Sequence, residues 1–128
     1  MQDAALRRLS RFDAADLGPH ATALFHELVR TAAAGLPLAT VILAASIVDV
    51  VQHERVGPVS YVDGATFSHA GSTANLSWLR GRRNHLVHHM GPSDGLMGEG
   101  DAGLWLAGDA ERAIITLLDF LNDLQLSK

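Results

Sequence analysis

Residues 37–54, PLATVILAASIVDVVQHE, decide the fold, because nearly every side of this stretch is apolar when it is drawn as an α-helix. The polar exceptions Ser46, Asp49 and His53 stand at i, i+3 and i+7, which is helical spacing. β-Branched residues are frequent, so a strand is the competing interpretation, but the run is too long for one strand. A helix that is apolar all round is buried on several sides. We therefore predict that it lies at the centre of a bundle or faces a partner subunit. Its apolar positions are Leu38, Val41, Ile42, Leu43, Ala45, Ile47, Val48, Val50 and Val51.

Two helices are predicted before this central stretch. Residues 3–17 form a short leading helix, which Gly18-Pro19 ends. Apolar residues repeat at three and four positions over residues 20–34, which predicts a second helix. Gly35 is a typical stop after it, and Pro37 suits the first turn of the central helix.

Two further helices are predicted after the central stretch, at residues 72–90 and 109–126. Residues 55–71 and the glycine-rich residues 91–107 are expected to be long loops. Asp109 suits the positive N-terminal end of the last helix. That helix carries the clearest apolar stripe of the chain, formed by Ile114, Leu117, Leu118, Leu121 and Leu124.

Length and composition predict one soluble domain over residues 1–128. The chain is 48% apolar and only 19% charged, which is enough apolar material for one core. Helices that follow one another closely pack as antiparallel neighbours. The expected fold class is therefore all-α, an up-and-down four-helix bundle with a short extra N-terminal helix.

Charge and residue types exclude several classes of function. The chain has no cysteine, which rules out disulfides, thiolate nucleophiles and cysteine-based metal sites. The net charge of −4 argues against a long basic surface for nucleic acid, so any such contact must be local. We expect no membrane span, since the central apolar run is shorter than the ~20 residues that a span needs. The first residues show no apolar run followed by a small-residue cleavage site, so no signal peptide is expected, and the lack of cysteine fits a cytoplasmic location.

The predicted helix at residues 72–90 carries a charge where its apolar stripe calls for a leucine. Leu76, Leu79 and Leu86 face the core at spacings of three and seven, and Arg83 occupies the position between them. A buried guanidinium without a partner is costly. Arg83 must therefore have a partner or lie in a wet cleft.

The same helix presents three polar side chains on one face. Arg80, Asn84 and His88 stand at i, i+4 and i+8, and Arg83 is close enough to reach that face. An arginine fork binds two phosphate oxygens, and a histidine exchanges a proton near neutral pH. This combination of side chains is what a phosphodiester or nucleotide site needs.

The pattern Arg83-Asn84-x-x-x-His88, preceded by Leu79-Arg80, resembles the signature helix of HEPN domains. Together with the bundle layout the likeness extends loosely over residues 20–126. The resemblance implies a helical bundle that pairs through its motif helix, and hence a homodimer. It also implies a metal-independent endoribonuclease that leaves a 2′,3′-cyclic phosphate, or a non-catalytic domain that binds RNA or a nucleotide. Such a domain can be the partner of a nucleotidyltransferase or an antitoxin in a toxin–antitoxin pair.

The resemblance also implies a role for each motif residue. Arg83 would stabilise charge on the scissile phosphate, Asn84 would position Arg83 or that phosphate, and His88 would be the general acid or base. Many members carry an acidic or polar residue on an earlier helix near the motif. Asp49 is the candidate for it, because it is the lone charge among the apolar residues of the central helix.

Other residues of the motif helix are candidates for substrate contacts, and plainer interpretations stay open. Arg80, Arg82 and His85 join Asp49 as candidate substrate-binding residues. His85 and His89 have the spacing of a metal pair but lack the neighbouring glutamate and a third ligand, so no metal or other cofactor is expected. Arg83 and Asp49 could also form a purely structural ion pair in a helical protein without chemistry.

Overall fold

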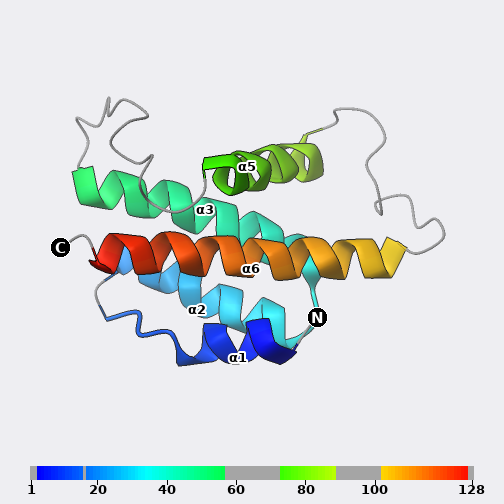
Figure 1. The fold of residues 1–128 in the computed structure, drawn as a ribbon, viewed down its shortest axis with the longest axis horizontal. Coiled ribbons are helices and arrows are strands. Elements are labelled where there is room, and N and C mark those ends of the chain that lie inside the picture. Colours follow the sequence, from blue (N-terminus) through cyan, green and yellow to red (C-terminus); the bar gives the residue numbers. More distant parts are fainter. Residues whose placement is uncertain (1–2, 16, 57–72, 89–101, 127–128) are drawn as a thin grey trace.

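The computed structural model describes residues 3–15, 17–56, 73–88 and 102–126. All regular structure in these residues is helical, with no strand among them, which confirms the all-α prediction. The helices are α1 (Asp3–Arg11), α2 (Pro19–Ala33), α3 (Pro37–Val56), α5 (Thr73–Val87) and α6 (Ala102–Leu126) (Figure 1).

The apolar stretch forms the central helix α3, as its sequence predicts. α3 packs against α2, α5 and α6, and α1 packs against α2 and α6. In Figure 1, α5 lies on one side of the α3 and α6 pair, and α1 and α2 lie on the other. By length and composition alone α3 could also cross a membrane, a property that the core helix of a soluble protein often shares. Its buried side chains are Thr40, Val41, Ala44, Ala45, Ile47, Val48 and Val51.

The last helix begins earlier than its sequence predicts. α6 starts at Ala102 instead of Asp109, so residues 102–107 of the predicted glycine-rich loop are helical. A glycine inside a helix costs only about 1 kcal/mol relative to alanine, and each added residue gains a helical hydrogen bond. Asp109 therefore lies inside the helix and does not face its positive end. The predicted stripe is confirmed, because Ile114, Leu117, Leu118, Leu121 and Leu124 are all buried.

The leading helix is shorter than predicted, since α1 ends at Arg11 and not at residue 17. The Asp13 carboxylate accepts a hydrogen bond of 2.9 Å from the Ala15 backbone N–H. An aspartate that bonds the backbone two residues later offers the chain a turn in place of a helix. Phe12 follows the helix directly and packs on Phe25, with 5.4 Å between the ring centroids.

The predicted breaks around α2 are present in the structure. Gly18 precedes the helix, and the Glu54 carboxylate of α3 accepts a hydrogen bond of 3.4 Å from the Ala21 N–H. A Cβ on Gly18 would lie 2.1 Å from a Glu54 carboxylate oxygen, so only glycine allows this approach. Gly35 has a φ of +71° just after α2, a conformation that glycine adopts without strain.

The motif helix is also shorter than predicted. α5 spans Thr73–Val87, whereas residues 72–90 were expected. His88 follows the last helical residue, but its backbone N–H still donates to the Asn84 carbonyl at 2.9 Å. The predicted loop at residues 55–71 is helical over its first two residues, because α3 continues to Val56. Residues 57–72 and 89–101, which hold most of both predicted loops, lie outside the described residues.

Candidate functional site

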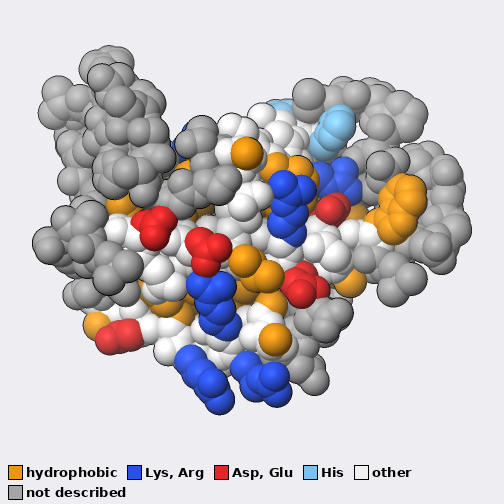
Figure 2. Space-filling model, in the orientation of Figure 1, with side chains coloured by type: hydrophobic (Ala, Val, Ile, Leu, Met, Phe, Trp, Pro, Cys, Tyr) orange, Lys and Arg blue, Asp and Glu red, His pale blue; other side chains and the backbone are white. Residues whose placement is uncertain are grey.

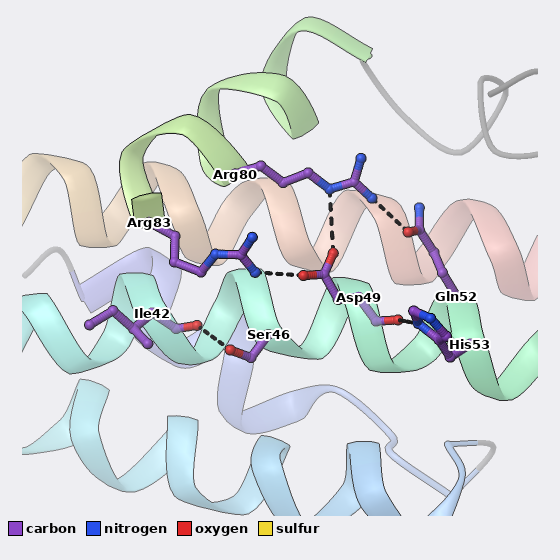
Figure 3. Close-up of polar contacts among 7 residues, drawn as sticks. All are labelled: Ile42, Ser46, Asp49, Gln52, His53, Arg80 and Arg83. Atoms are coloured by element: carbon purple, nitrogen blue, oxygen red, sulfur yellow. Dashed lines mark hydrogen bonds and ion pairs between the residues drawn. The ribbon is translucent and has the colours of Figure 1, made fainter. Parts of the chain in front are cut away.

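Asp49 lies where α3 faces α5, and two arginines of α5 converge on its carboxylate (Figure 3). Arg83 Nη1 donates to Asp49 Oδ2 at 2.5 Å. Arg80 Nε lies 3.4 Å from the other carboxylate oxygen, Asp49 Oδ1. One carboxylate therefore bridges two guanidiniums that stand almost one turn apart on the motif helix.

The apolar residues of α5 explain why Arg83 reaches this carboxylate. Leu76 and Leu79 are buried, and Leu86 is partly buried against the core. These leucines place one face of α5 on the bundle, and Arg83 occupies the same face between them. The Arg83 side chain is 22% exposed and that of Asp49 is 34% exposed. The sequence prediction that Arg83 needs a partner at a core position is thus confirmed, and the partner is Asp49.

Gln52 completes the arrangement and was not found by sequence reasoning. Its side-chain oxygen accepts a hydrogen bond of 2.6 Å from Arg80 Nη2. Gln52 stands three residues after Asp49, on the same face of α3, so helical spacing from Asp49 was the signal that could have found it. We refer to Asp49, Gln52, Arg80 and Arg83 as the Asp49 cluster.

The other polar residues of α3 do not join the Asp49 cluster. The Ser46 hydroxyl donates to the Ile42 carbonyl of its own helix at 2.9 Å. Nδ1 of His53 lies 2.8 Å from the Asp49 backbone oxygen, on an exposed part of the surface. Of the three residues in the predicted polar stripe, Ser46 and His53 therefore bond the backbone of their own helix, and only Asp49 contacts α5.

Arg82 lies away from the Asp49 cluster, although it was a candidate for substrate contacts. Its Nε donates to Asp109 Oδ2 of α6 at 2.6 Å, and its side chain is only 11% exposed. Nearby, Arg112 of α6 lies over the Trp78 ring at 4.1 Å and bonds Asn75. These contacts join α5 to α6, so Arg82 contributes to the position of the motif helix.

The remaining motif residues lie toward the end of α5 at different depths. Asn84 and His85 are half-buried, and His88 is exposed. Figure 2 shows histidine side chains beside arginines on the surface near α5. The helical register of Arg80, Asn84 and His88 is kept as far as His88, whose backbone N–H still bonds Asn84. His89, the second residue of the possible metal pair, lies outside the described residues.

The Asp49 cluster keeps a net positive charge, since two guanidiniums share one carboxylate. Arg80 is the more accessible of the two, with 43% of its side chain exposed. Guanidinium groups that are held in place by a carboxylate and an amide remain able to donate to phosphate oxygens with their free N–H groups. Near a partly buried surface such contacts are stronger than in bulk water. The cluster is therefore suited to bind an anion where α5 faces α3, and no side-chain hydrogen bond among the described residues joins it to Asn84 or His88.

Comparison with known proteins gives no match to a protein-family model, to a curated protein or to a solved structure. The likeness to HEPN domains therefore depends on the residues and contacts given above. Among the described residues, no three histidine, aspartate or glutamate side chains gather closely enough to hold a metal ion.

Proposed function

We propose that this chain is a HEPN-like up-and-down bundle that acts as a metal-independent endoribonuclease in the cytoplasm. The observation that carries the proposal is the contact between Arg83 and Asp49 at 2.5 Å. The HEPN resemblance implies an acidic or polar residue of an earlier helix near the motif, and the contact with Arg83 supports Asp49 as that residue. His88 stands exposed one turn beyond Asn84, where a substrate has access to its ring.

The proposed reaction is an intramolecular transesterification at a phosphodiester of the RNA chain. The ribose 2′-oxygen loses its proton and attacks the adjacent phosphorus, the new bond closes a 2′,3′-cyclic phosphate, and the bond to the 5′-oxygen breaks. The 5′-oxygen takes up a proton and leaves as a hydroxyl. No oxidant, reductant or metal is needed for this balance.

The motif residues divide these tasks by their chemistry. Arg83, with Arg80 beside it, donates to the phosphate oxygens as negative charge grows on them. His88 accepts the 2′-hydroxyl proton or supplies the proton for the leaving oxygen. A single histidine does only one of these at a time, so we propose a homodimer in which the second His88 does the other. Asn84 orients the phosphate or Arg83.

The central experiment measures RNA cleavage by purified protein in the presence of a chelator. His88→Ala should lower the cleavage rate by about a hundredfold or more, the usual contribution of a general acid or base. His26→Ala is the matched control, because His26 is an exposed histidine of α2 away from the motif. Products of the unaltered protein should carry a 2′,3′-cyclic phosphate. Cleavage that needs a divalent metal, or that survives His88→Ala, would contradict the enzyme proposal.

A second candidate function is binding of RNA or a nucleotide without turnover, as in a partner module of a nucleotidyltransferase or antitoxin. It is favoured by the engagement of both Arg80 and Arg83 with Asp49, which leaves fewer donors for a transition state. Saturable binding of an RNA that stays intact, weakened by Arg83→Gln but not by Arg30→Gln, would support it. No binding and no cleavage would leave the Asp49 cluster with a structural role.

A further inference from the structure

A second cationic site lies on the opposite side of the bundle from the motif helix. A cleft of about 510 Å³ runs between α1 and α6, and three arginines of α1 line it. Its other lining side chains include Phe12, Asp13 and Asn122. α1 packs on α2 and α6, and α5 is on the other side of the α3 and α6 pair (Figure 1). The cleft is therefore separate from the Asp49 cluster.

The three arginines are concentrated far beyond what the composition of the chain predicts. The chain holds nine arginines and one lysine among its ten basic residues, with a net charge of −4, yet Arg7, Arg8 and Arg11 fall within one nine-residue helix. In Figure 2, basic side chains gather along the edge of the molecule where α1 lies. This edge is a local positive region on an acidic protein.

One of these arginines, Arg8, forms an ion pair with an acid of α6. Arg8 Nη2 contacts Asp119 Oδ1 at 2.6 Å. Arg7 and Arg11 stand at i and i+4 on one face of α1 and line the same cleft. Like charges at this spacing repel each other. An anion between the two guanidiniums would remove the repulsion and receive two planar sets of donors.

The lining of the cleft combines cationic, aromatic and hydrogen-bonding side chains. Arg7, Arg8 and Arg11 lie on α1, and Phe12 and Asp13 follow Arg11 directly in the chain. The Phe12 ring is half-buried and supplies an aromatic surface, while the Asp13 carboxylate and the Asn122 amide supply hydrogen-bonding groups. A phosphate suits the arginines, and a base with its sugar suits the Phe12 ring and the polar side chains. The volume also lies in the range of about 300–1,000 Å³ that small-ligand sites occupy.

We infer that the cleft between α1 and α6 binds a nucleoside phosphate, with the phosphate on Arg7 and Arg11 and the nucleoside against Phe12. This site goes beyond the proposed ribonuclease function and does not depend on it. The nucleotide would bind on a face that the motif helix does not reach.

The test is a calorimetric titration of the full chain with AMP, adenosine and inorganic phosphate. AMP should bind saturably, and the double variant Arg7→Gln/Arg11→Gln should weaken its binding by about tenfold or more. Arg30→Gln is the matched control, because Arg30 is an exposed arginine of α2 without an ion pair among the described residues, and it should change AMP affinity less than twofold. Inorganic phosphate should compete with AMP, and adenosine should bind more weakly than AMP.

Thermal unfolding provides a second measurement. AMP should raise the melting temperature of the unaltered protein and of Arg30→Gln, but not that of the double variant. The inference is overturned if no saturable AMP binding is found, or if Arg30→Gln weakens it as much as the double variant does. It is also overturned if Arg83→Gln alone abolishes binding, which would place the nucleotide at the Asp49 cluster. Binding at α1 of an RNA strand but not of AMP would overturn it as well.

Discussion

At the scale of single residues, Asp49 joins the central helix α3 to the motif helix α5 through its contacts with Arg80 and Arg83. Its identity as a candidate followed from the sequence, because an acid surrounded by apolar residues of a helix needs a basic partner and Arg83 occupies a core position on another helix. The contact between these two residues was left open by the sequence, because no spacing along the chain fixes which face of α3 meets α5, and the structure shows it. The sequence did not predict that Gln52 bonds Arg80 or that Arg82 pairs with Asp109. Both contacts depend on how α5 is rotated against α3 and α6.

Asp49→Ala should destabilise the protein and also impair the site. It leaves two neighbouring guanidiniums without their carboxylate, and since both partners are partly exposed we expect a loss of about 1–3 kcal/mol, below that of a fully buried pair. Chemical denaturation checks the value. Asp119→Ala is the matched control, because it removes the exposed partner of Arg8 and should cost at most about 1 kcal/mol. Equal losses in the two variants would show that Asp49 has no special structural role.

Gly18 and Glu54 should be energetically coupled. In the unaltered chain Gly18→Ala displaces the Glu54 carboxylate from the start of α2, which costs about 1 kcal/mol as a lost cap. The φ of −67° at Gly18 suits alanine, so the same change gains about 0.4–1 kcal/mol by restricting the unfolded chain. With Glu54→Ala already present, Gly18→Ala should therefore become stabilising. A double-mutant cycle by denaturation measures the coupling, and additive effects would argue against the contact.

At the scale of helices, the sequence predicted the existence of each element better than its ends. The apolar periods of α3 and α6 identify their cores, and the buried residues follow them closely. The errors lie at Asp13, where a side chain ends α1, and at residues 102–107, where the glycine-rich sequence predicts a loop but α6 has already begun. A local turn bond and the modest cost of a helical glycine are both about 1 kcal/mol, so tertiary packing decides between the outcomes.

Gly108→Ala tests the early start of α6. Gly108 is an exposed position inside the helix, and nothing lies within 4 Å of an added Cβ. The variant should be more stable by about 0.5–1 kcal/mol, because alanine favours a helix interior over glycine. Gly35→Ala is the opposite control, since its positive φ makes alanine unfavourable there. Denaturation curves compare the two, and a neutral or destabilising effect of Gly108→Ala would argue against a helix at this position.

At the scale of the whole molecule, the arginines are divided among separate tasks. One contributes to the position of the motif helix through Asp109, two converge on Asp49, and three line the cleft between α1 and α6. The sequence showed the acidic net charge and the charged motif, but it could not show this division. Which arginine faces which acid depends on helix packing, and a count of charges along the chain contains no information about packing.

This division predicts how RNA binding depends on salt. Each neutralised phosphate of a single strand contributes about −0.7 to the slope of log affinity against log salt concentration. If Arg80 and Arg83 are the phosphate contacts of the motif face, the slope for a short RNA bound to the non-cleaving His88→Ala variant should be about −1 to −2. Fluorescence titrations at several salt concentrations give the slope, and Arg80→Gln should make it shallower while Arg30→Gln leaves it unchanged. A slope steeper than about −4 would require a long phosphate track, which two arginines on a protein of net charge −4 do not provide.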